Sequence, residues 1–373
     1  MKSIIYFVSE DWYFCSHRLP IARKALADGF KVVVITRINK HGDIIKSEGF
    51  ELEPIEIKRG GVNLVSEFKT LFALYSCYKK YNPDIAHHVA LKPVIYGTLV
   101  ARFIGSIKIV NAIAGLGFVF ISNKKRVKLL RFFIHRLFRF LFDTKNGQLI
   151  LQNKDDLEYF LKNKLVKKDR VNIIRGSGVD INKFIPVEEC IGIPIVMLAS
   201  RMLWDKGVGE FIEAAKILKQ EGVKSRFVLV GKVDSENPTS ISNSQLNEWN
   251  ELGIVEWWGE RSNMYEVLAQ AHIVCLPSYR EGLPKVLLEA ASCGKPIIAT
   301  DVPGCREIVH DGENGVLVPL KDSKSLADAI KGLVNNPNKR ERMGENGRRL
   351  VEREFSEEIV AFQTSRVYWK FLV

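Results

Sequence analysis

The sequence has no uninterrupted apolar segment approaching the ~20 residues that a membrane-spanning helix needs, which argues against an integral membrane protein. Its six cysteines include no Cys-x-x-Cys pair. Neither a zinc site nor a disulfide framework is therefore indicated, and a reducing compartment such as the cytosol is expected. No Gly-x-Gly-x-x-Gly follows the first apolar run, which disfavours a dinucleotide-dependent dehydrogenase. Internal repeats and low-complexity tracts are absent as well.

Positive charge is concentrated in the first half of the chain. The 373 residues carry a net charge of +12. Residues 1–180 contain 31 Lys and Arg against 16 Asp and Glu, whereas the remainder contains 24 against 27. An anionic partner is therefore expected for the first half: a membrane surface, a phosphate-bearing acceptor or nucleic acid.

Both halves alternate apolar strands with helical patterns, which predicts an α/β fold with two parallel sheets, each covered on both faces and together lining a cleft. The length fits two domains, which we place at residues 1–187 and 188–356, joined by a linker at 184–194. Residues 356–373 have helical periodicity. The expected strands lie at residues 3–9, 31–36, 85–89, 107–113 and 148–152, then at 195–200, 226–230, 254–258, 273–276 and 296–300.

Two carboxylates flank the start of a predicted helix directly after the apolar run 273–277. Glu281 lies in a loop marked by Gly and Pro, and Glu289 follows two helical turns later. The helix N-terminus between them offers free N–H groups and the positive end of a dipole, which suits a phosphate. Carboxylates that accept hydrogen bonds from hydroxyls beside a phosphate cradle indicate a nucleotide-sugar site. The alternative is an ordinary helix with a solvated glutamate at each end.

Two cations lie on another strand-to-helix loop of the same half. The apolar strand 194–200 leads into Arg201 and Lys206, after which a helical pattern resumes. Ligands of a doubly wound sheet bind outside the carboxyl ends of its strands. An arginine fork and a compact lysine charge form a suitable pair for a diphosphate, although either cation alone is typical of a solvated surface.

These motifs resemble those of the retaining family 4 glycosyltransferases, which have the GT-B fold of two Rossmann-like domains facing a cleft. Glu281 and Glu289 match the family's pair of glutamates separated by seven residues. The resemblance implies that Glu281 contacts donor-sugar hydroxyls, that Glu289 contacts the ribose, and that Arg201 and Lys206 hold the diphosphate. It assigns catalysis to Glu281, Arg201 and Lys206. It also implies that residues 357–373 pack back on the first domain. The donor-binding set is Arg201, Lys206, Gly282, Leu283, Pro284, Lys285 and Glu289.

No Asp-x-Asp is present, so the usual carboxylate pair for a divalent metal is missing. We therefore expect no metal and no cofactor, with the two cations and the helix N-terminus neutralising the diphosphate. The resemblance implies a front-face displacement in which a donor phosphate oxygen takes the acceptor's proton, without a protein nucleophile.

Residues 124–142 form a basic amphipathic segment with seven Lys and Arg and no acid. Such a helix can lie in the interface of an anionic bilayer, or it can be a core-facing helix with a solvated cationic back. Nucleic acid is a weaker alternative, because no nucleic-acid module accompanies the charge. The expected cationic face is Lys124, Lys128, Arg131, His135 and Arg139, and the expected apolar face is Leu130, Phe133, Ile134, Leu137, Phe138 and Leu141.

The first half supplies the acceptor-side candidates His17, Arg18, His88 and Lys92, each of which could instead have a purely structural role. The loop at 9–20 departs from the family's glycine pair, which puts its approach to the donor phosphate in doubt.

Ser-His-Arg-Leu-Pro at 16–20, Lys-Pro-Val-Ile-Tyr-Gly at 92–97 and Gly-Leu-Gly at 115–117 resemble bacterial glycan-assembly enzymes. These add a hexose or N-acetylhexosamine, such as GalNAc, to an undecaprenyl diphosphate-linked sugar. The resemblance implies a UDP-sugar donor, an α-glycosidic product and a peripheral position on the cytoplasmic face of the membrane. The alternatives are a UDP-N-acetylhexosamine epimerase of the same fold and a non-catalytic partner subunit.

Overall fold

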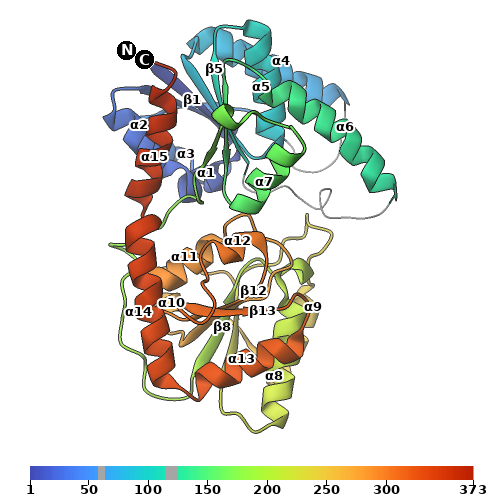
Figure 1. Ribbon diagram of the computed structural model, residues 1–373, viewed down its shortest axis with the longest axis vertical. Helices are drawn as coiled ribbons and strands as arrows, with labels where there is room; N and C mark the ends of the chain where they lie inside the picture. The colour runs from blue at the N-terminus through green and yellow to red at the C-terminus, as the bar shows by residue number, and fades with distance from the viewer. Residues whose placement is uncertain (58–63, 114–124, 373) are drawn as a thin grey trace. The chain divides into compact units, whose positions relative to one another are not determined.

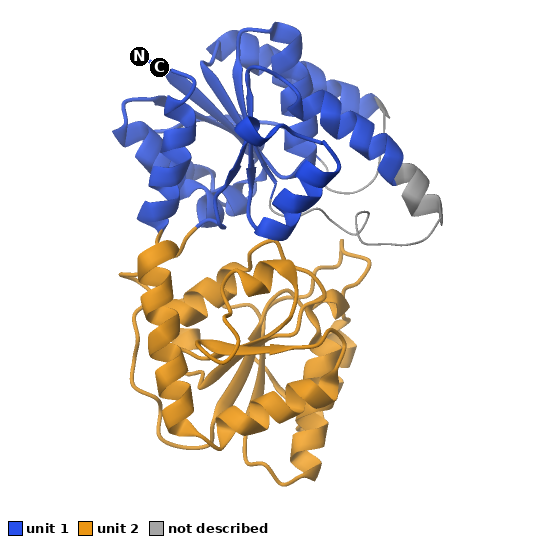
Figure 2. Cartoon of the chain, viewed as in Figure 1, with its two compact units in different colours: residues 1–177, 357–373 blue, residues 178–356 orange. Residues whose placement is uncertain are grey.

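The structure is a computed structural model that describes residues 1–57, 64–113 and 125–372, without the side chains of 64 and 125–130. It consists of two compact units, Met1–Ser177 with Glu357–Val373 and Gly178–Ser356 (Figure 2). Gly115–Gly117 and Lys124 lie outside the described residues, as do the side chains of Lys128 and Leu130.

The first unit is built on a parallel sheet of seven strands in the order β3-β2-β1-β4-β5-β6-β7 (Figure 1). Its central strands were predicted from their apolar runs. The edge strands β3 and β7 were missed, because they are short and are not fully buried apolar runs. The strands are β1 (Ser3–Glu10), β2 (Lys31–Arg37), β3 (Glu51–Pro54), β4 (Ile85–Val89), β5 (Lys108–Ile113), β6 (Gly147–Leu151) and β7 (Val171–Ile173).

Helices cover both faces of this sheet. Alternate residues of β1 serve the two faces: Tyr6 packs with α1, α2 and α15, whereas Phe7 packs with α4 and α5. The final helix, α15, completes the first of these layers by burying Val360 and Tyr368 there. The helices are α1 (Asp11–His17), α2 (Leu19–Ala27), α3 (Gly42–Ser47), α4 (Leu64–Tyr81), α5 (Leu91–Ile104), α6 (Lys125–Phe142), α7 (Lys154–Lys162) and α15 (Glu357–Trp369).

The second unit has a parallel sheet of six strands in the order β10-β9-β8-β11-β12-β13. Its central strand β8 is entirely buried, as expected for a strand with a helical layer on each face. The edge strand β13 was missed in the sequence. The strands are β8 (Ile195–Ala199), β9 (Arg226–Val230), β10 (Glu256–Trp257), β11 (Ile273–Leu276), β12 (Ile297–Thr300) and β13 (Gly315–Val318).

Two hydrophobic layers sandwich the second sheet. Met197 of β8 packs toward α11 and α14, and Leu198 packs toward α8 and α13. Val179 and Phe184 join the first of these layers, which is why this unit already begins at Gly178. The helices are α8 (Val208–Gln220), α9 (Asn243–Glu251), α10 (Met264–Ala269), α11 (Lys285–Ser292), α12 (Pro303–Arg306), α13 (Ser323–Val334) and α14 (Pro337–Glu354), with a 3₁₀ turn at Trp204–Lys206.

None of the helices within the described ranges combines the length and apolarity that crossing a membrane requires.

Candidate functional site

The loop that follows β8 carries Arg201 and Lys206 and closes against the end of β11. Lys206 ends the 3₁₀ turn, and Gly207 then adopts φ = 72°. A Cβ on Gly207 would lie 2.0 Å from the carbonyl oxygen of Pro277. Only glycine allows this backbone conformation and this close approach, so the loop and the strand end are held together.

Hydrogen bonds fasten the same loop to the segment before α11. The carbonyl oxygen of Asp205 accepts from the Tyr279 amide at 2.8 Å and from the Ser278 hydroxyl at 3.2 Å. As a result Lys206 Nζ forms an ion pair with Glu281, and the two side chains are only 20% and 11% exposed. Two residues predicted separately on two loops therefore lie in contact.

The segment from Glu281 to Glu289 has the predicted loop-then-helix form. α11 begins at Lys285, and Pro284 at its N-cap has no side-chain group that could accept from the first amides. A Cβ on Gly304 of α12 would lie 2.6 Å from the Glu281 carbonyl oxygen, so α12 packs directly against the backbone of this loop. Glu289 lies half-buried on the second turn. The loop residues Gly282, Leu283 and Pro284 join these two carboxylates.

Arg201 is paired with a carboxylate that the sequence did not single out. Its Nη1 lies 2.7 Å from Oδ2 of Asp234, in the loop after β9. The two loops meet because a Cβ on Gly231 would lie 1.7 Å from the Ser200 carbonyl oxygen, which leaves room only for glycine. Both predicted cations are thus neutralised by acids within this unit. The position of Asp234 in the sequence could have indicated this role, because the residue follows the carboxyl end of β9, and ligands bind at that end of the strands.

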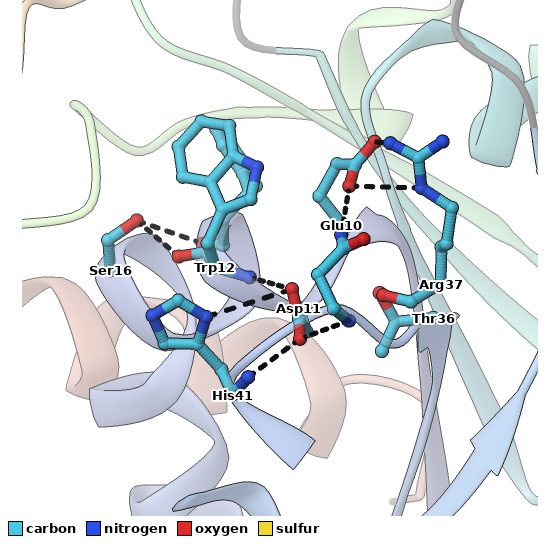
Figure 3. Close-up of polar contacts among 9 residues, drawn as sticks. Glu10, Asp11, Trp12, Ser16, Thr36, Arg37 and His41 are labelled. Atoms are coloured by element: carbon cyan, nitrogen blue, oxygen red, sulfur yellow. Dashed lines mark hydrogen bonds and ion pairs between the residues drawn. The ribbon is translucent and has the colours of Figure 1, made fainter. Parts of the chain in front are cut away.

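In the first unit, β1 runs directly into α1, and two buried carboxylates occupy the place of the expected loop (Figure 3). Asp11 accepts from the amides of Trp12, Asn39 and His41 at 2.7 to 2.8 Å. Burial alone would raise the pKa of Asp11, but these amides outweigh it and lower the pKa. Glu10 accepts from the Arg37 guanidinium at 2.6 Å. Because Asp11 already occupies these three amides, they are not available to a phosphate, in keeping with the missing glycine pair.

Two acceptor-side candidates, His17 and Arg18, lie where α1 meets α2. The His17 ring stacks on Tyr13 with centroids 4.2 Å apart, and its Nδ1 lies 2.6 Å from the Ser16 hydroxyl. Arg18 is 3% exposed, and its Nε and Nη2 are buried with no hydrogen-bond partner in the described part of the chain.

The other two candidates, His88 and Lys92, have partners inside the first unit. His88 is fully buried, with Nε2 2.8 Å from the Tyr78 hydroxyl and Nδ1 2.8 Å from Asn111 Oδ1. Burial lowers the pKa of His88 to about 4. Lys92 Nζ lies 2.9 Å from Glu67. These contacts describe a neutral core histidine and a paired lysine.

The apolar side of α6 is divided between the core and the surface. Phe138 and Leu141 are buried against α7, and Ile134 and Leu137 pack beside them, as the core-facing alternative predicts. Phe133, expected on the same face, is exposed.

Comparison with known proteins identifies the fold and the class. Residues 3–153 match the family model "Glycosyl transferase 4-like", and residues 192–350 match "Glycosyl transferases group 1". The chain therefore belongs to the group 1 glycosyltransferases, with a family 4-like first region, and is a glycosyltransferase.

The structure resembles sucrose-phosphate synthase from Thermosynechococcus elongatus, with a TM-score of 0.81, 20% identity and coverage of 100% and 99% of the two chains. HepE from Anabaena in complex with UDP gives a TM-score of 0.77 at 17% identity, covering 99% and 100%. These neighbours confirm the predicted GT-B fold.

Among its relatives, the chain is 31% identical to the N,N'-diacetylbacillosaminyl-diphospho-undecaprenol alpha-1,3-N-acetylgalactosaminyltransferase of Campylobacter jejuni, covering 94% of each chain. It is 28% identical to the UDP-Gal:alpha-D-GlcNAc-diphosphoundecaprenol alpha-1,3-galactosyltransferase of Escherichia coli, covering 72% of this chain and 71% of the relative. The predicted resemblance to undecaprenyl diphosphate-sugar transferases is thus confirmed.

Proposed function

We propose that the protein transfers a sugar, an N-acetylhexosamine such as GalNAc, from a UDP-sugar to an undecaprenyl diphosphate-linked saccharide, with retention and an α-glycosidic product. The observation that carries this proposal is the Lys206–Glu281 pair beside the N-terminus of α11, with Arg201 on the same loop as Lys206. Donor and acceptor are those printed in the names of the two bacterial relatives.

Each group at this site has a proposed task. Arg201, Lys206 and the α11 amides stabilise the charge that develops on the departing UDP, and no metal or other cofactor takes part. Glu281 and Glu289 accept from sugar and ribose hydroxyls, which aligns the anomeric carbon with the acceptor. Gly282, Leu283, Pro284 and Lys285 contribute backbone around the diphosphate. A donor phosphate oxygen accepts the proton of the acceptor hydroxyl as the glycosidic bond forms and the bond to UDP breaks.

The proposed lipid acceptor calls for a peripheral protein on the cytoplasmic face of the membrane, and the outer helices of the first unit carry a suitable surface. Arg102 of α5 lies over the Phe140 ring of α6 at 4.2 Å, and Tyr75 of α4 contacts Phe103 at 5.8 Å, so the three helices adjoin. Cations interleaved with exposed aromatics favour the interface of an anionic bilayer. Exposed phenylalanines occur on all three helices: Phe68, Phe72, Phe103, Phe132, Phe133 and Phe140.

The proposal is tested by incubating the purified protein with a panel of radiolabelled UDP-sugars, a bacterial polyprenyl diphosphate-sugar extract and EDTA. Label in the organic phase is then measured. We expect label from one donor, at least tenfold less with Glu289→Ala because a charged hydrogen-bond acceptor is lost, and full transfer with Glu251→Ala. Glu251 is an exposed carboxylate of the same unit, on α9.

Absence of lipid-linked label from every donor would overturn the proposal. Conversion of the donor into a different UDP-sugar would instead identify an epimerase, and no binding of UDP at all would identify a non-catalytic subunit. Loss of transfer in EDTA, restored by a divalent cation, would refute metal independence.

A further inference from the structure

The most unusual charge in the first unit is the guanidinium of Arg18. Its side chain is 3% exposed, and neither Nε nor Nη2 has a hydrogen-bond partner among the residues that the structure describes. Burying a charged group without a partner costs several kcal/mol, so proteins retain such a group where it has a task.

The groups around Arg18 do not neutralise it. His87 Nδ1 lies 2.6 Å from the Tyr368 hydroxyl, which lies 3.1 Å from the Tyr6 hydroxyl. Burial raises the pKa of Tyr6 far above neutral pH and lowers the pKa of His87, so these side chains are uncharged. The positive charge of Arg18 lowers the His87 pKa further.

The charge of Asp28 acts on Tyr6, but this carboxylate already has other partners. It forms an ion pair with Lys24 and accepts a hydrogen bond from the Ser365 hydroxyl. The cluster of Arg18, Tyr6, His87 and Tyr368 therefore retains an excess positive charge.

The backbone of Arg18 is fixed at the junction of α1 and α2. Its amide donates to the Phe14 carbonyl at 2.7 Å, and its own carbonyl accepts from the Ala22 amide at 2.9 Å. It lies one helix after the carboxyl end of β1, the edge at which parallel α/β sheets bind ligands. A guanidinium whose Nε and Nη2 have no partner in the described part of the chain is suited to a phosphate-type oxyanion.

We infer that Arg18 binds a phosphate oxyanion, namely the diphosphate of the polyprenyl-linked acceptor. This inference rests on the proposed function for the identity of the acceptor. The donor's diphosphate has its own cations, Arg201 and Lys206, in the second unit, and the start of α1 is closed to phosphate by Asp11. Arg18 thus provides one specific contact between the positively charged first half of the chain and an anionic partner.

The test compares Arg18→Met and Arg18→Lys with the matched control Arg23→Met. Arg23 lies on neighbouring α2, and its exposed guanidinium is paired with Glu48. For each variant we would measure the acceptor KM, the donor KM and the thermal unfolding midpoint. A second arm measures the shift in unfolding midpoint caused by inorganic pyrophosphate with UDP at saturation, so that the donor site is already filled.

For Arg18→Met we expect a rise of about 10- to 100-fold in acceptor KM, as for other lost charge-assisted hydrogen bonds, with an unchanged donor KM. Because Nε and Nη2 of the replaced side chain have no hydrogen-bond partner in the described ranges, the unfolding midpoint should stay the same or rise. Arg18→Lys should recover part of the acceptor affinity, and Arg23→Met should behave as wild type. The pyrophosphate shift should disappear with Arg18→Met alone.

An unchanged acceptor KM, or a rise in donor KM instead, would overturn the inference while leaving the proposed function intact. So would a lower unfolding midpoint combined with normal acceptor use, because that result assigns Arg18 a structural role. If wild type transfers no sugar to lipid but still shows the Arg18-dependent pyrophosphate shift, the proposed function fails and the oxyanion site stands. Loss of both would refute both.

Discussion

If Arg201 binds the donor diphosphate as proposed, Asp234 competes with the donor for its guanidinium. The guanidinium lies 2.7 Å from the Asp234 carboxylate, and the two side chains are 45% and 17% exposed. In the proposed site, the diphosphate of the UDP-sugar replaces this carboxylate, so part of the binding free energy is lost in separating the pair. The variant Asp234→Asn removes the competing charge and keeps the shape of the side chain, so we expect tighter binding of UDP.

The size of the gain follows from the exposure of the pair. Ion pairs of this kind are worth about 0.2–1 kcal/mol, because water screens them. Since 1.4 kcal/mol corresponds to a factor of ten, Asp234→Asn should lower the Kd for UDP by a factor of about 1.4 to 5. Added salt should narrow the difference between variant and wild type, because it already weakens the pair in wild type.

Isothermal titration of UDP into wild type, Asp234→Asn and Glu236→Gln measures this effect. Glu236 is an exposed carboxylate in the same loop, so its variant removes an equal charge and should bind UDP nearly as wild type does. Weaker binding to Asp234→Asn would refute the reasoning, because Asp234 would then orient Arg201 toward the donor. Equal gains in both variants would reduce the effect to net charge.

Further predictions concern three other regions. Gly207→Ala should reduce the free energy of unfolding by more than about 1 kcal/mol in chemical denaturation, because its Cβ would overlap the Pro277 carbonyl at a positive φ; a Gly222→Ala variant, with a similar φ but no atom within 4 Å, should lose less. The pKa of His88 is about 4 in the folded protein, whereas a histidine in the unfolded chain binds a proton below about pH 6.5. As the pH falls from 6.5 to 4, the unfolded chain therefore binds one more proton than the folded protein. The free energy of unfolding should fall by roughly 3 kcal/mol from this residue over that range. His88→Gln should show a smaller decline over the same range, and an equal decline would contradict the assignment. Phe132→Ser with Phe133→Ser should reduce sedimentation with anionic phospholipid vesicles several-fold, whereas Phe362→Ser, an exposed phenylalanine on α15, should not; equal losses would argue against a specific surface.

The sequence was most informative where burial and local geometry determine structure together. The central strands of both sheets are continuous apolar runs. Because ligands bind outside the carboxyl ends of parallel strands, Arg201, Lys206 and Glu281 were expected in one region, and Lys206 and Glu281 do form an ion pair. The edge strands β3, β7 and β13 were not predicted, because each is a short run of residues that are partly exposed.

Side-chain pairing could not be predicted in the same way. Asp234 reads as one more acid in a polar loop, and its contact with Arg201 depends on the close approach of Gly231 to Ser200. His88 reads as a candidate for chemistry, and only the positions of Tyr78 and Asn111 show that both its ring nitrogens are used internally. The apolar side of α6 required the position of α7 before its buried and exposed phenylalanines could be distinguished.

The return of the chain to the first unit at Glu357 has a consequence for biosynthesis. The hydrogen bond between His87 and Tyr368 joins residues 281 positions apart, and α15 covers α2. A ribosome must therefore finish the whole of Gly178–Ser356 before the first sheet can receive its last helix. Until then, the face of the first unit that α15 covers stays exposed in the nascent chain, and exposed apolar surface of this kind favours aggregation.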